Sequence, residues 1–149
     1  MKKNRCRDAF TLIEVLIVVI IMAVLAATVI PQFTNSTRDA KLNQMEFNLR
    51  TMRSQTEMYK FQHNGVYPET ANFTAQMTAA SNISGGTSGD TPYGPYLEEV
   101  PYNPFNESNE IVEVAAQGTV PTAVVAGGAG WQYDPSTGGV YPNNAEYYE

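Results

Sequence analysis

The chain has 149 residues, a net charge of −6 and one cysteine, Cys6. This length allows one domain besides a long helix, and the acidic balance argues against binding of DNA or RNA by a basic surface. Cys6 precedes the first apolar run, so the rest of the chain has no disulfide or thiol chemistry, and Cys6 and the single His63 cannot form a metal site.

The first 30 residues combine a basic leader with a long apolar run. Residues 1–9 carry four basic side chains and one acid, whereas the rest of the chain carries five basic and fourteen acidic side chains. Residues 10–30 read FTLIEVLIVVIIMAVLAATVI, with one charge, Glu14. A helix of this length spans about 30 Å, the thickness of the hydrocarbon core of a bilayer. The run predicts a transmembrane helix, and the basic leader places the long remainder outside the cytoplasm.

Glu14 is an unusual residue for a helix in lipid. A carboxylate there costs about 2.5–3.5 kcal/mol near the bilayer centre and less near an end, so such a group is normally partnered. If the chain were cut before Phe10, the new amino terminus would lie one helical turn from Glu14. The new amino terminus could then pair with Glu14 of the same chain or with Glu14 of a neighbouring copy. The alternative is an acid at the headgroup level that needs no partner.

The helix is expected to continue beyond Pro31. Six residues spaced 3, 4, 3, 4 and 3 apart form one stripe of an amphipathic helix: Leu42, Met45, Leu49, Met52, Thr56 and Tyr59. Asn64-Gly65 is a stop signal, and a helix from Phe10 to about Gln62 would be roughly 80 Å long. We expect the stripe to pack on a small domain rather than in a coiled coil, and His63 to be a solvated residue at the helix end.

The remaining residues, 64–149, predict a small head. A loop region comes first, with a short helix at about 72–80, and four short strands follow at 111–114, 123–125, 130–133 and 139–141. Turn residues 134–139 join the last two strands, and such short connections predict antiparallel hairpins. The predicted fold is therefore α+β, with a long N-terminal helix packed on a small antiparallel sheet. Its parts are a leader (1–9), a transmembrane or filament-core helix (10–30), an amphipathic continuation (31–63) and the head (64–149).

The leader followed by FTLIEVLIVV resembles the N-terminal signal of the type IV pilin-like family. The stretches MYKFQHNGVYP (58–68) and YLEEVPYNPF (96–105) are closest to the major pseudopilins of type II secretion. The resemblance implies cleavage by a prepilin peptidase between Ala9 and Phe10, although the family usually has Gly where this chain has Ala9. It also implies N-methylation of Phe10, pairing of Glu14 with a neighbouring subunit during assembly, and a helix kink at Pro31.

The function that the resemblance implies is structural. Subunits would wait in the bacterial inner membrane with the head outside the cytoplasm, then assemble through the N-terminal helix into a homo-oligomeric filament with secretion or pilus assembly machinery. The lack of a cysteine pair favours a pseudopilin over a type IV pilus pilin for adhesion, motility or DNA uptake. A membrane-tethered extracytoplasmic binding module is the alternative from another class.

The sequence contains no recognisable catalytic motif, and an enzyme is not expected. The adjacent Glu98 and Glu99 would face opposite sides of a strand, so they do not predict a paired acid site. The resemblance raises the question of calcium, because major pseudopilins hold it in an Asp-rich C-terminal loop. This chain lacks that run of Asp, and the remaining candidate ligands are Asn106, Glu107, Asn109, Glu110 and Asp134.

Overall fold

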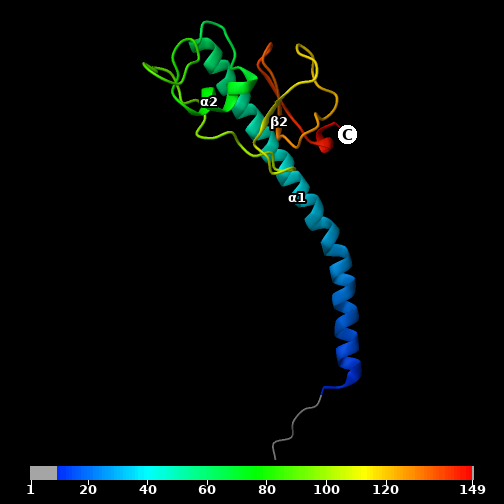
Figure 1. The fold of residues 1–149 in the computed structure, drawn as a ribbon. Coiled ribbons are helices and arrows are strands. Elements are labelled where there is room, and N and C mark those ends of the chain that lie inside the picture. The colour runs from blue at the N-terminus through cyan, green and yellow to red at the C-terminus, as the bar shows by residue number, and fades with distance from the viewer. Residues whose placement is uncertain (1–9, 149) are drawn as a thin grey trace, which may run out of the picture. The chain divides into compact units, whose positions relative to one another are not determined.

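The computed structural model describes residues 10–148, without the side chain of Pro31. Its elements are α1 (Leu12–Gln62), η1 (Thr70–Asn72), α2 (Phe73–Thr78), β1 (Ile111–Glu113), β2 (Trp131–Asp134), β3 (Gly139–Pro142) and η2 (Ala145–Tyr147) (Figure 1). The chain divides within α1 into two compact units. We call residues 10–40 the N-terminal unit and residues 41–148 the head unit. The α+β class is confirmed.

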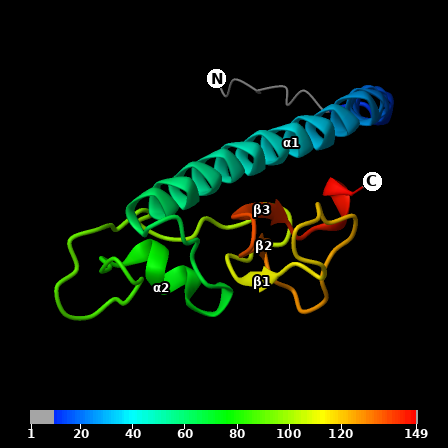
Figure 2. The same cartoon turned by 90° about the horizontal axis from the view of Figure 1, so that it is seen from above.

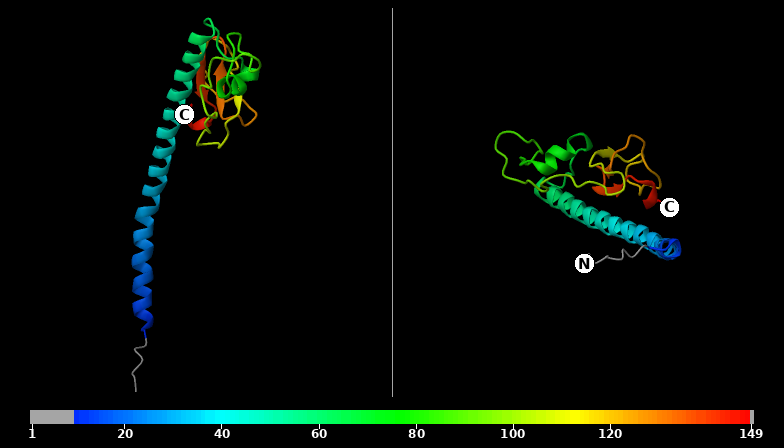
Figure 3. Two further views of the ribbon diagram at one scale, coloured as in Figure 1. Left: turned by 90° about the vertical axis from the view of Figure 1, so that its left-hand side faces the viewer. Right: turned by 90° about the horizontal axis from the view of Figure 1, so that it is seen from below.

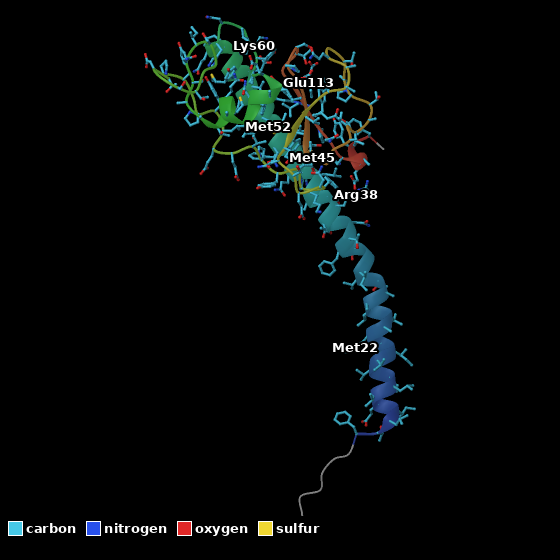
Figure 4. The ribbon with its side chains drawn as sticks, viewed as in Figure 1. Met22, Arg38, Met45, Met52, Lys60 and Glu113 are labelled. Atoms are coloured by element: carbon cyan, nitrogen blue, oxygen red, sulfur yellow. The ribbon has the colours of Figure 1, made fainter. Side chains whose placement is uncertain are left out.

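The N-terminal unit is helical from Leu12 onward. Every side chain from Phe10 to Ile30 is exposed, and Met22, which is 64% exposed, marks this part of α1 in Figure 4. The helix assignment is unbroken through Pro31, so this proline does not end α1, as the sequence predicts. Whether it kinks the helix remains a prediction.

In the head unit, the predicted stripe of α1 packs against the rest of the unit. Met45, Leu49, Met52 and Tyr59 are buried in one apolar core with Trp131, and Thr56 is also buried. Figure 4 labels Met45 and Met52 where α1 meets the other segments. The stripe therefore packs on a small domain, which confirms the expectation.

The stop at Asn64-Gly65 is also confirmed, and its mechanism is visible. Asn64 and Gly65 both have positive φ, 54° and 82°. The amide of Gly65 donates to the carbonyl oxygen of Lys60 at 2.9 Å. This is the bond of a Schellman motif, which ends a helix by turning the chain into the left-handed region.

The sheet has the order β1-β2-β3 and is mixed rather than antiparallel. β2 and β3 are antiparallel, as predicted, because a tight turn joins them. β1 and β2 are parallel, and here the expected antiparallel pairing is wrong. The connection between them, residues 114–130, is long enough to return the chain to the starting end of β1, which a parallel pair requires. We call it the β1–β2 loop.

The predicted strand at 123–125 is also absent, because those residues lie within the β1–β2 loop. The carbonyl oxygens of Ala123 and Val125 accept hydrogen bonds from the side chains of Gln132 and Asn143. Side chains thus take the place of the partner strand that the apolar pattern predicts.

Specific hydrogen bonds join the sheet to its surroundings. Arg53 of α1 donates through Nε and an Nη atom to the carbonyl oxygen of Val140 in β3, at 3.0 and 2.7 Å. Figure 2 accordingly shows β3 as the strand nearest α1. The Tyr133 hydroxyl donates to the Pro68 carbonyl oxygen at 2.9 Å. Burial raises the pKa of this hydroxyl. Within the head unit, α2 and the strands lie on the same side of α1 (Figure 3).

Candidate assembly site at the start of α1

Glu14 is held by the residue three positions before it. Its Oε2 accepts hydrogen bonds from the backbone amide of Thr11 at 2.8 Å and from the Thr11 hydroxyl at 2.7 Å. In return, the amide of Glu14 approaches the Thr11 Oγ1 at 3.3 Å. This reciprocal arrangement is a capping box, which satisfies amides that the first turn of a helix leaves unpaired.

This role of Thr11 was not predicted from the sequence. The signal was present, because Thr-x-x-Glu directly before an apolar run is the capping-box pattern. The structure therefore adds a local partner to the two considered for Glu14, its own amino terminus and that of a neighbour. Both of those pairings require the chain to be cut, and Ala9, on one side of the expected cut, lies outside the described residues. Phe10, on the other side, is 85% exposed.

The surroundings of Glu14 are apolar and face outward. Leu12, Ile13, Val15 and Leu16 are between 51% and 84% exposed. Within the described residues, α1 is the helix long and apolar enough to cross a membrane by length and composition. A surface this apolar requires cover from lipid or from other protein. Anchoring in a membrane through this part of α1 would meet that requirement.

The structure does not bring the candidate calcium ligands together. Asn106, Glu107, Asn109 and Glu110 lie in the segment before β1, and the Glu110 carbonyl oxygen accepts from the amide of Trp131, where β2 begins. Asp134 lies at the other end of β2. Within residues 10–148, no group of three or more His, Cys, Asp or Glu residues could hold a metal ion.

Asp134 is buried and already satisfied. Its carboxylate accepts from the Gly118 amide at 2.7 Å, from the amide and hydroxyl of Ser136 at 2.9 and 2.7 Å, and from the Thr137 hydroxyl at 2.9 Å. Burial alone would raise the pKa of Asp134, but these hydrogen bonds outweigh it and hold the pKa below its usual value. The groups around Asp134 therefore do not fit a calcium ion, which takes six to eight oxygen ligands.

His63 is buried, contrary to the prediction of a solvated helix end, and only 1% of it is exposed. Its ring stacks on that of Tyr59 with centroids 3.7 Å apart. Nδ1 lies 2.7 Å from the Tyr59 carbonyl oxygen and Nε2 lies 3.0 Å from the Ser81 hydroxyl. Because a carbonyl oxygen only accepts, Nδ1 carries a proton and donates it to the Tyr59 carbonyl oxygen. The segment after α2, which contains Ser81, folds back over the end of α1, and sequence periodicity does not reveal this contact.

Two family profiles match the chain in succession. Residues 4–30 match the prokaryotic N-terminal methylation motif. Residues 32–137 match the family described as type II secretion system (T2SS), protein G. Together the two matches include the start of α1 and most of the head unit.

Curated relatives agree with the second profile. A type II secretion system core protein G from Vibrio cholerae is 28% identical over 121 residues, which are 80% of this chain and 80% of that protein. The protein of the same name from Pseudomonas aeruginosa is 27% identical over 120 residues, or 78% of this chain and 80% of that protein. The one from Klebsiella pneumoniae is 25% identical over 111 residues, or 74% and 78%. No solved structure matches the chain significantly.

Proposed function

Because this chain belongs to the type II secretion system protein G family, we propose that it is a major pseudopilin, the structural subunit of a filament that serves protein secretion. The observation that carries this proposal is the exposed apolar start of α1, with one carboxylate at its first turn. Such a surface suits two environments in succession, lipid before assembly and neighbouring helices afterwards. The family profile over residues 32–137 favours secretion over a type IV pilus.

Processing would prepare Glu14 for its role. A prepilin peptidase would cut between Ala9 and Phe10 and methylate the new amino group, in keeping with the methylation motif at residues 4–30. The new positive charge would then lie one turn from Glu14. A carboxylate and an ammonium group in apolar surroundings attract each other strongly once both are desolvated.

Assembly would exchange one set of partners of Glu14 for another. Before assembly, the Thr11 amide and hydroxyl stabilise the carboxylate. In the filament, the amino terminus of a neighbouring subunit would pair with it and fix the axial register. The residues of the head unit that face outward would then form the surface of the filament.

The leader supports a location for the unassembled subunit. Its basic residues favour the cytoplasmic side of the bacterial inner membrane, so α1 would cross the bilayer and the head unit would lie outside the cytoplasm. Release from the membrane into the filament would require the assembly machinery of the secretion system.

Substitution of Glu14 tests the assembly role. Glu14→Ala is expected to leave membrane insertion intact, because an apolar residue is favoured in lipid, and to reduce filament yield sharply. The matched control is Asp39→Ala, which removes another exposed acid from the same helix and is expected to leave filaments unchanged. Filament yield is measured by shearing and immunoblotting, and membrane insertion by fractionation. Normal filaments from Glu14→Ala would contradict the pairing.

Mass spectrometry of the mature protein tests the processing separately. The expected product begins at Phe10 and carries one added methyl group on its amino terminus. An intact Met1, or a cut after Ala27, would contradict the proposed processing.

A further inference from the structure

Side-chain amides hold the β1–β2 loop at the end that approaches β2. Gln132 Nε2 donates to the Ala123 carbonyl oxygen at 2.9 Å. Asn103 Nδ2 donates to the Gly130 carbonyl oxygen at 2.8 Å, and Asn106 Nδ2 donates to that of Ala129 at 3.0 Å. Together with Asn143, we call these three residues the amide network.

Asn143 is the centre of the network and is only 5% exposed. Its Nδ2 donates to the carbonyl oxygens of Val125 and Ala129 at 2.9 and 3.0 Å. Its Oδ1 accepts from the Val125 amide at 2.7 Å and from Gln132 Nε2 at 3.2 Å. Every hydrogen-bonding position of this side chain is therefore used.

The backbone of Asn143 also forms hydrogen bonds in this region. Its amide donates to the Gly130 carbonyl oxygen at 3.0 Å, and its carbonyl oxygen accepts from Asn106 Nδ2 at 3.2 Å. One residue thus joins the start of the chain after β3 to both the middle and the end of the β1–β2 loop. Loss of its side-chain amide would leave the Val125 carbonyl oxygen without this donor and the Ala129 carbonyl oxygen with Asn106 Nδ2 alone, and an unpaired buried carbonyl oxygen is costly.

A divalent cation could hold a loop in a similar way, by binding several carbonyl oxygens at once. Here the amide groups donate to those oxygens, so their partly positive hydrogens lie where a cation would have to approach. Within the amide network, the buried oxygen left without a partner is Gln132 Oε1. One neutral oxygen is far from the six to eight ligands, carboxylates among them, that calcium takes.

The other end of the loop is closed by hydrogen bonds as well. The Gly118 amide donates to the Asp134 carboxylate, which also accepts from both Ser136 and Thr137. The Asp134 carboxylate is therefore committed to hydrogen bonds with the loop and with the turn between β2 and β3. Neither end of the loop offers the oxygen ligands that a cation site requires.

We propose that the amide network closes the β1–β2 loop in place of a divalent cation, so that this head folds without calcium, unlike the major pseudopilins that the chain otherwise resembles. Asn143 is the residue on which this closure depends. The inference concerns the fold of the head unit and stands independently of the proposed role in a filament.

Calcium dependence of the full chain in detergent micelles is the first test. Heat unfolding followed by the fluorescence of Trp131, the single tryptophan, should give the same Tm in calcium chloride and in EDTA. Elastase, which cleaves after small residues such as Ala and Val, should also cut the β1–β2 loop at the same rate in both. A rise in Tm of several degrees with calcium, or calcium-dependent protection from elastase, would overturn the proposal.

Asn143→Asp is the second test, because it keeps the size of the side chain and removes both of its donors. We expect Tm to fall by about 5 °C or more and elastase to cut the loop faster than in the wild type. Asn43→Asp is the matched control, since it adds the same charge at an exposed position of α1 in the same unit, and it should change neither readout. If the two variants behaved alike, the assignment to Asn143 would be wrong.

Discussion

The helix α1 runs through both units, and its apolar side chains are exposed in one unit and largely buried in a stripe in the other. In the N-terminal unit, the apolar side chains from Phe10 to Ile30 are exposed on every face of α1. In the head unit, the apolar stripe of α1 is buried against the rest of the unit, whereas Phe47, Met58 and Phe61 lie outside the stripe and are exposed. The head unit therefore covers the stripe with its own residues, whereas the apolar run of the N-terminal unit depends on lipid or on other copies.

This difference separates stability from assembly. A substitution in the buried stripe removes contacts within one chain and so lowers the free energy of unfolding of the head unit. A substitution in the exposed run removes contacts that exist only in a membrane or a filament. Trp131 is fully buried in the head unit, so its fluorescence reports on the head unit alone.

The largest expected effect comes from a matched pair of methionines. Met52 is fully buried and Met22 is 64% exposed. Met52→Ala should lower the free energy of unfolding of the head unit by about 2–5 kcal/mol, because it leaves a cavity in the core. Met22→Ala should change it by less than about 0.5 kcal/mol. Urea unfolding in micelles, followed by Trp131 fluorescence, measures both, and equal losses would contradict the division into units.

An intermediate effect is expected at Asp134, and it depends on pH. The pKa of Asp134 is lowered in the folded state, so its carboxylate stabilises the head unit above its unfolded pKa, and this contribution is lost as pH falls through the folded pKa. Asp134→Asn should cost about 1–2 kcal/mol at pH 7, and the difference from the wild type should shrink below about pH 4.

The control for this pH dependence is Asp90→Asn, at an exposed position of the same unit. It should leave the stability at pH 7 and its acid dependence as in the wild type. The comparison uses Trp131 fluorescence in urea across a pH series. A constant difference between Asp134→Asn and the wild type at all pH values would show that the charge of Asp134 does not stabilise the fold.

The smallest effect is expected at the surface of α1 in the head unit. Arg50 and Glu46 form an ion pair at 3.3 Å, with side chains 81% and 61% exposed. Glu46→Ala should change the free energy of unfolding by less than about 0.5 kcal/mol, because solvent and salt screen exposed pairs. The same urea measurement at low and high salt checks this, and a loss above 1 kcal/mol would contradict it.

Local patterns predicted α1 well. The apolar run, the stripe through Met45 and Met52, and the stop at Asn64-Gly65 depend on residues close together in the sequence, and all three match the structure. The capping box of Thr11 and Glu14 was equally local and could have been predicted. The roles of Phe10 and Glu14 in processing and assembly remain predictions, since they involve other molecules.

The head was predicted less completely, because its decisive contacts join distant residues. Val112 pairs with Gln132 in a parallel register, which the length of the β1–β2 loop permits but short-range alternation cannot reveal. His63 is buried because Ser81 and Tyr93, from a later loop, reach the helix end. The sequence predicts that polar residues such as Asn143 lie in surface loops. In the fold, their side chains instead form hydrogen bonds to the backbone of the β1–β2 loop, where a partner strand was expected.

The sequence by itself determined the long helix, its division into an apolar run and a one-faced continuation, and the membership of the chain in a family of filament subunits. These features depend on periodicity, composition and motifs of adjacent residues. Only the tertiary structure decided the mixed sheet, the buried His63 and the closure of the β1–β2 loop by amides. The physical reason is that a buried carbonyl oxygen needs a donor but does not specify where in the chain that donor lies.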